Sequence, residues 1–234
     1  VVTVIISVSA IIITVAISTV IITVIISVST VVITVTISTV VTVVISVTVI
    51  SSVIVSVTAI VTGGIRVNAS RVGDPAAWRE KSGISEPTKP GTINIILHID
   101  AALSPGALAR ALVTCTEAKT AAIQELLAPS RYSSGIATGS GTDGTILIAN
   151  PLSSTYLTNA GKHCKLGEYI GRTVKKAVKE ALDRQSGLNP AFQHNILNRM
   201  DRFGITEDSL WSTYLQKLSE KEKKLSPFVR AEFE

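Results

Sequence analysis

The sequence predicts an α+β fold (mixed α/β), with a central β-sheet covered by helices and a C-terminal helical hairpin. Short β-branched runs near Val57, Thr92 and Thr145 predict strands of one sheet. Apolar residues at helical spacing over 105–127 and 162–185 predict the covering helices. The intervals between these elements leave the strand order open.

The composition divides the chain. Residues 1–62 contain only Val, Ile, Thr, Ser and Ala, and all 22 basic and 17 acidic residues follow from Arg66 onward. A net charge of +5 permits an anionic ligand but is far from the clustered basic face of a nucleic-acid-binding protein, so we expect no nucleic-acid partner. Cys115 and Cys164 suggest no disulfide framework and fit a reducing, cytoplasmic compartment. No signal peptide is visible.

Three interpretations remain open for the uncharged N-terminal segment. β-Branched residues favour strands, but the segment lacks the Gly, Pro, Asn and Asp residues that turns need. It is therefore a set of strands whose side chains this sequence does not represent faithfully, a low-complexity fusion or translated repeat, or a membrane anchor. We expect residues 1–55 to add strands to the same domain, residues 56–187 to form its core, and residues 188–234 to form the hairpin.

The first regular strand is VSVTAIVT, and Gly63-Gly64 follows it as a turn or bulge. Asn68, just past this strand, is a turn-forming residue or a ligand-binding one. Residues 75–90 contain three prolines and predict a surface connection. The next strand, TINIILHI, is apolar enough for burial on both faces, and its Asn94 and His98 point to the same side. His98 is more typical of a core or edge histidine than of a ligand.

Ser104-Pro105 predicts a helix start, because a hydroxyl N-cap precedes proline at the first helical position. Two apolar stripes run along this helix, which indicates packing on two sides. One stripe contains Leu108, Leu112, Cys115 and Ala122, and the other is made of small residues. Glu117 shares a face with Thr114, so it is the best candidate for a partly buried carboxylate with a raised pKa, as general acid–base chemistry uses.

Helical spacing continues after residue 162. Lys162, His163 and Lys165 gather at the positive N-terminal end of the predicted second helix, where a polar or negative group is favoured. His163 and Cys164 alone are weak evidence for a metal site, and none is predicted. Asn189-Pro190 and Thr206 then begin the two helices of the hairpin, whose apolar residues we expect to cover the domain core.

A glycine-rich loop between the two long helices is the strongest functional signal. Residues 136–148 read IATGSGTDGTILI, with Gly139, Gly141 and Gly144 permitting close backbone approach. The letters match the dinucleotide fingerprint G-x-G-x-x-G, but a strand follows where that fingerprint requires a helix. We therefore predict a binding or catalytic loop of another kind.

Several blocks of the sequence resemble the adenosylcobinamide amidohydrolase family of corrinoid salvage, found in archaea or bacteria. The blocks are VTGGIRVNASRVGDP, the segment from GTINIILHIDAALSPGALARALVTCTEAK to its helix end, SGIATGSGTDGTILIAN and AGKHCKLGEYIGRTVKKAVKEAL. The resemblance covers about Val57 to Gly187, and residues 1–55 depart from it. It implies an enzyme that hydrolyses an amide of adenosylcobinamide to adenosylcobyric acid and aminopropanol.

This resemblance directs the choice of site residues. We expect Glu117 as base and later acid, Asp143 to orient a water or a neighbour, and Lys119, Lys162 or His163 as proton donors. Backbone N–H groups near Gly139 and Gly141 would hold the oxyanion, and a covalent route through a loop hydroxyl stays open. The remaining predicted substrate-binding residues are Asn68, Asn94, Thr138, Ser140 and Thr142.

No cofactor is expected, since the corrinoid is the substrate, and the oligomeric state stays open. The alternatives to an enzyme are a non-catalytic corrinoid-binding protein and a membrane-anchored binding module.

Overall fold

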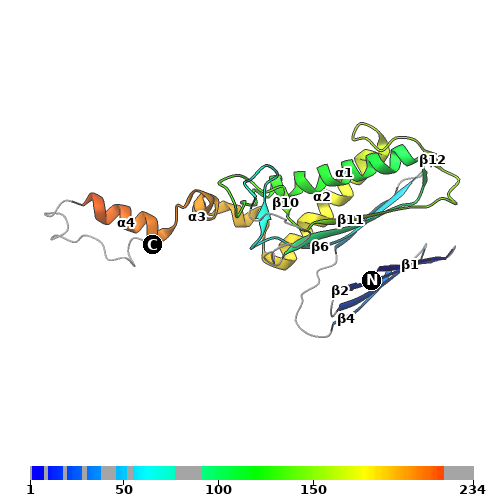
Figure 1. The fold of residues 1–234 in the computed structure, drawn as a ribbon, viewed down its shortest axis with the longest axis horizontal. Helices are drawn as coiled ribbons and strands as arrows, with labels where there is room; N and C mark the ends of the chain where they lie inside the picture. Colours follow the sequence, from blue (N-terminus) through cyan, green and yellow to red (C-terminus); the bar gives the residue numbers. More distant parts are fainter. Residues whose placement is uncertain are drawn as a thin grey trace, which may run out of the picture. The chain divides into compact units, whose positions relative to one another are not determined.

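The computed structural model describes residues 2–7, 10–17, 20–27, 31–37, 46–51, 55–76 and 91–218, with side chains from residue 55 onward. The expected surface connection at 75–90 thus lies mostly outside the described residues. The chain divides into two compact units, Val1–Val43 and Val44–Glu234 (Figure 1). In the first unit four strands pair antiparallel in chain order: β1 (Val2–Ser7), β2 (Ala10–Ile17), β3 (Val20–Ser27) and β4 (Val31–Ile37).

The second unit contains the predicted sheet. Its order is β11 (Gly144–Ala149), β8 (Thr92–Ile99), β6 (Ser56–Gly64) and β5 (Ser46–Ser51). β8 pairs parallel with β11 and antiparallel with β6, which pairs antiparallel with β5. All three strands predicted after residue 55 are present, and the mixed α and β content confirms the α+β class. Two short ladders join β7 (Ala69–Ser70) to β10 (Gly139–Ser140) and β9 (Ala102–Leu103) to β12 (Tyr156–Leu157).

Helix α1 (Pro105–Glu125) connects the parallel strands β8 and β11. The Ser104 hydroxyl accepts a hydrogen bond from the Ala107 N–H at 3.2 Å, which confirms the predicted N-cap. The helix ends slightly before the predicted residue 127, because Leu127 adopts a left-handed φ of 52°. Every second residue of β8 is buried, with Ile93, Ile95, Leu97 and Ile99 in the core.

Helix α2 (Lys165–Ser186) packs against α1, β6 and β5, so α1 and α2 cover one face of the sheet (Figure 1). It starts three residues later than predicted, which leaves Lys162 and His163 in the preceding turn. A Cβ on Gly167 would stand 2.0 Å from the Gly161 carbonyl oxygen, so this glycine lets the turn pack onto the helix. Gly187, at φ 69°, ends α2 as predicted.

One face of α1 is not packed as predicted. Leu108 and Leu112 are 37% and 43% exposed, whereas Cys115 and Ala122 of the same stripe are buried. The buried residues of α1 are mainly those of the small-residue stripe, and the helix packs against α2. The expectation that α1 is covered on two sides is therefore wrong for its N-terminal half within the described residues.

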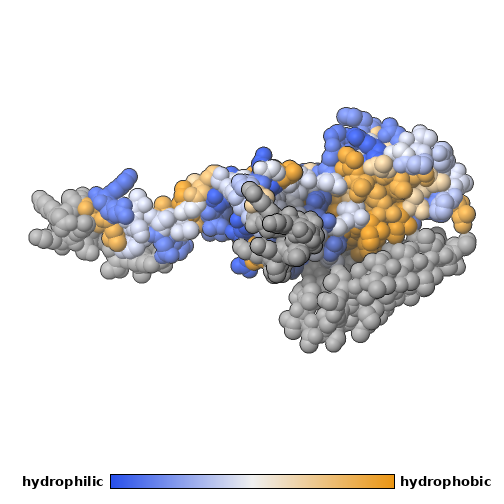
Figure 2. All heavy atoms as spheres, in the orientation of Figure 1, coloured by the Kyte–Doolittle hydropathy of each residue, from blue (hydrophilic) through white to orange (hydrophobic). Residues whose placement is uncertain are grey.

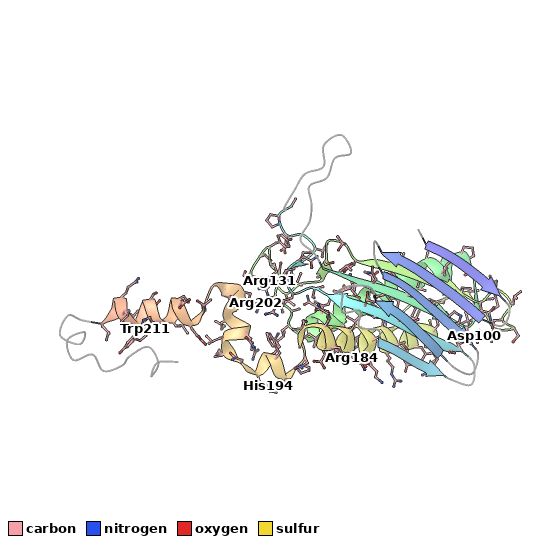
Figure 3. All side chains as sticks on the ribbon, turned by 90° about the horizontal axis from the view of Figure 1, so that it is seen from below. Asp100, Arg131, Arg184, His194, Arg202 and Trp211 are labelled. Atoms are coloured by element: carbon pink, nitrogen blue, oxygen red, sulfur yellow. The ribbon has the colours of Figure 1, made fainter. Side chains whose placement is uncertain are left out.

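The C-terminal helices form but do not cover the core. The first predicted helix is broken into η1 (Ala191–His194), α3 (Ile196–Met200) and η2 (Asp201–Phe203), because Asn195 is extended and caps α3 with its side chain. Thr206 caps α4 (Glu207–Lys217) as predicted. Neither α3 nor α4 has a buried residue, and Ile196 is 72% exposed. An ion pair of 3.2 Å between Arg131 and Asp201 ties this segment to the end of the sheet opposite Asp100 (Figure 3).

Candidate functional site

The Asp143 carboxylate organises the glycine-rich loop. Its Oδ1 accepts hydrogen bonds from the Ile93 N–H at 3.0 Å and the Ser140 hydroxyl at 2.7 Å. Its Oδ2 accepts the Ser140 N–H at 3.1 Å and pairs with the Lys119 ammonium. Both charged side chains are only 12% exposed. The Thr142 N–H donates to the Ser140 hydroxyl at 3.2 Å, so Lys119, Ser140, Thr142 and Asp143 form one network, which we call the Asp143 cluster.

The topology of β8, α1 and β11 explains this meeting. Because β8 and β11 are parallel, their starts lie together, and Asp143 immediately before β11 reaches the N–H of Ile93 near the start of β8. Helix α1 returns in the opposite direction, so its last turns bring Lys119 to the same end of the sheet. Residues 24 positions apart in sequence thereby become an ion pair.

Gly139 makes room for this pair. A Cβ at this position would lie 2.2 Å from Asp143 Oδ2 and 2.8 Å from Lys119 Nζ, closer than real Cβ contacts. Gly141 is different, because a Cβ there would meet nothing within 4 Å and the residue is exposed. The first glycine is thus needed for packing, and the second lies at the open tip of the loop.

A second set of hydrogen bonds fixes the outer part of the loop to the start of β8. The Thr142 hydroxyl donates to the Gly91 carbonyl at 2.7 Å, and the Thr92 hydroxyl donates to the Thr142 carbonyl at 2.7 Å. The buried Asn68 side chain donates to the same Gly91 carbonyl. Asn68 and Thr142, both predicted substrate-binding residues, therefore lie near one another, and Asn68 supports the loop from behind.

Some residues that hold the loop were missed in the sequence. Gln124 Nε2 donates to the Ala137 carbonyl at 2.9 Å, and the Thr120 hydroxyl donates to the Thr138 carbonyl at 3.3 Å. Thr138 also accepts the Val72 N–H on its hydroxyl at 2.9 Å. The sequence contained a signal for both residues, because Thr120 and Gln124 are four positions apart beside Lys119 and so mark a polar face on a mostly apolar helix.

The remaining predicted catalytic residues, Glu117 and His163, lie with Lys162 on another side of α1. Glu117 pairs with Lys162 at 3.2 Å, and Lys162, His163 and the unpredicted Arg110 line a cavity of about 370 Å³. The buried Thr114 hydroxyl donates to the Ala160 carbonyl at 2.8 Å and so fastens this turn to α1. We call Arg110, Glu117, Lys162 and His163 the Lys162 cluster.

The structure does not unite the two clusters. Glu117 and Lys119 are two positions apart on α1, which is a rotation of about 200° around the helix axis. The Glu117 side chain is 44% exposed, so the expectation of a partly buried carboxylate is wrong. The predicted catalytic roles of Glu117 and His163 stay predictions, but these residues do not share a cluster with Asp143.

Asn94 lies on the other face of the sheet from Lys119. It alternates with the buried Ile93 and Ile95, and its side chain occupies the space beside Gly144, where a Cβ would stand 2.8 Å from its oxygen. His98 shares this face and is half-buried, and burial lowers its pKa while the nearby Asp100 charge opposes the shift. Neither residue contacts the Asp143 cluster by a hydrogen bond that the structure shows.

Other features lie apart from the predicted residues. A cavity of about 460 Å³ between the β6–β7 turn and the C-terminal helices contains none of them. Burial raises the pKa of the Cys115 thiol to about 12, which makes it a poor nucleophile. Among the described residues no group of three or more His, Cys, Asp or Glu side chains is arranged to hold a metal ion. No helix in the described ranges is both long and apolar enough to cross a membrane.

Comparison with known proteins gives a family match. The model of the adenosylcobinamide amidohydrolase family matches residues 27–190. The uncharacterized protein MJ1613 of Methanocaldococcus jannaschii is 40% identical over 138 residues, which cover 54% of this chain and 53% of that protein. The chain thus spans about half the length of this relative. No solved structure gives a significant match.

Proposed function

Because the chain belongs to the adenosylcobinamide amidohydrolase family, we propose that it hydrolyses the aminopropanol amide of adenosylcobinamide. The products would be adenosylcobyric acid and aminopropanol, as in salvage of cobalamin precursors. The observation that carries this proposal is the Asp143 cluster, in which a hydroxyl, a carboxylate and an ammonium adjoin a glycine-rich loop.

The hydrogen bonds of the cluster favour Ser140 as the attacking group. Ser140 Oγ donates to Asp143 Oδ1 at 2.7 Å, the contact in which a carboxylate takes the proton of a hydroxyl nucleophile. The Thr142 hydroxyl donates instead to the Gly91 carbonyl, which cannot act as a base. Ser140 is therefore the better candidate of the two loop hydroxyls.

The proposed reaction has three steps. Ser140 Oγ bonds to the amide carbonyl carbon, its proton passes to Asp143, and the oxyanion is held by the backbone at Gly141 and by the Lys119 ammonium. The carbon–nitrogen bond then breaks as the nitrogen takes a proton from the Lys119–Asp143 pair, releasing aminopropanol. Water hydrolyses the resulting ester and restores Ser140. No step requires a metal or cofactor.

The sequence-based prediction, in which Glu117 acts as the base for water, can be distinguished from the Ser140 mechanism by experiment. Replacing Ser140→Ala should lower kcat by about three orders of magnitude if Ser140 is the nucleophile, while Glu117→Gln should change it little. Water activated by Glu117 would give the reverse, since loss of a general base costs about 10²–10⁴-fold. Ser153→Ala is the matched control, because that hydroxyl donates to the Asp100 carbonyl at the far end of the sheet.

The assay is release of free aminopropanol from adenosylcobinamide, measured for wild type and each variant. Activity in wild type that disappears in Ser140→Ala and persists in Ser153→Ala supports the proposal. Binding of the corrinoid without release of aminopropanol by wild type would instead favour a non-catalytic corrinoid-binding protein.

A further inference from the structure

An uncharged surface leads to the Asp143 cluster. Leu108 and Leu112 precede Lys119 on α1 by eleven and seven positions, about three and two helical turns, so they share its face. Both are exposed, at 37% and 43%. Figure 2 shows an apolar area over the part of the molecule where α1 and β11 lie. Cys115, between Leu112 and Lys119 on this face, is buried, so the two exposed leucines lie about two and three helical turns from the Lys119 end of the candidate site.

Strand β11 supplies the second part of this surface. It is the edge of the four-stranded sheet, and no strand in the described part of the chain pairs with its outer side. The strand Gly144–Ala149 has no charged residue, and it begins directly after Asp143. An unpaired edge presents backbone N–H and C=O groups that can bind another amide.

These features match one kind of occupant. The corrin macrocycle of the proposed substrate has an apolar body and a periphery of carboxamide side chains. Its body suits the exposed leucines of α1, and its carboxamides suit the donors and acceptors of a strand edge. Resting on the proposed function, we propose that Leu108, Leu112 and the outer edge of β11 form the platform that holds the macrocycle, while the Asp143 cluster acts on the aminopropanol amide.

The test measures binding separately from chemistry. Adenosylcobinamide and adenosylcobyric acid both contain the macrocycle, so their dissociation constants are measured by equilibrium dialysis, with detection by corrin absorbance. Leu112→Glu should weaken binding of both by about tenfold or more, because a charge replaces an apolar contact. Turnover at saturating substrate is recorded for each variant as well, so that a loss of affinity is measured apart from a loss of chemistry. Leu112→Ala should give a smaller loss in the same direction.

The control is Leu215→Glu, a leucine on α4 with a similar exposure of 40%. It should leave both dissociation constants unchanged, and circular dichroism should show all variants folded. Equal affinities in wild type, Leu112→Glu and Leu112→Ala would overturn this inference and leave the proposed function standing. If Leu112→Glu then also converted a dimer to a monomer, the surface would be assigned to a second copy of the chain. A wild-type protein that neither binds nor hydrolyses the corrinoid would overturn the proposed function as well.

Discussion

Removing either member of the Lys119–Asp143 pair should have unequal effects on stability. Asp143→Ala deprives four donors of their acceptor, namely the Ile93 and Ser140 N–H groups, the Ser140 hydroxyl and the Lys119 ammonium. The ammonium is then left 12% exposed without the carboxylate. Breaking a buried pair in this way costs about 3–5 kcal/mol of the free energy of unfolding.

Lys119→Met should cost less. Methionine fills much of the space of the lysine stem, and the Asp143 carboxylate keeps its hydrogen bonds from Ile93 and Ser140. We expect a loss of about 1–2 kcal/mol. Adding Lys119→Met to Asp143→Ala should then restore part of the lost stability, because it removes the unpaired ammonium.

Urea unfolding, followed by circular dichroism at helical wavelengths, measures these changes in the free energy of unfolding, because α1 to α4 all lie in the second unit. Glu180→Ala, which breaks an exposed ion pair with Arg184, is the control and should cost at most about 1 kcal/mol. The reasoning is refuted if Asp143→Ala costs no more than this control, or if the double variant is the least stable of the set by the sum of the single losses.

Three further predictions concern other contacts. Gly139→Ala should destabilise the domain and lower activity, because its Cβ would clash with Asp143 and Lys119; unchanged urea midpoints and turnover would contradict this. In the native protein a thiol reagent at pH 8 should modify Cys164 but not the buried Cys115. Peptide mass spectrometry measures the labelling of each cysteine, and equal labelling of the two would contradict this prediction. Hydrogen bonds from Lys175 and, second, from Lys179 lower the pKa of Glu125. The free energy of unfolding of wild type should therefore exceed that of Glu125→Gln by about 0.5 kcal/mol at pH 7, and this difference should disappear as the pH falls below the usual glutamate pKa of 4.5. A difference that grows in acid would contradict this.

Local signals in the sequence predicted the helix ends well. Ser104-Pro105, Gly187 and Thr206 act through contacts with the next few residues, so the sequence alone specifies them. Other ends were predicted less well, since α2 starts three residues later than expected and the Asn195 cap divides a segment whose apolar spacing predicted one helix. The strands after residue 55 were equally evident, because β-branched runs of that length have few alternatives.

Features that depend on distant neighbours were less predictable. The spacing of Leu108 and Leu112 identified an apolar face, but spacing cannot say whether another element covers that face. Lys119 and Asp143 were both named as site residues, yet their pairing follows from the parallel arrangement of β8 and β11. The exposure of Glu117 likewise depends on where the turn before α2 lies.

The most direct test of the central claim is the incubation of purified protein with adenosylcobinamide, followed by measurement of free aminopropanol and adenosylcobyric acid. We predict equal amounts of the two products from wild type and almost none from Ser140→Ala, with Ser153→Ala active. Absence of both products from folded wild-type protein, or full activity in Ser140→Ala, would contradict the account.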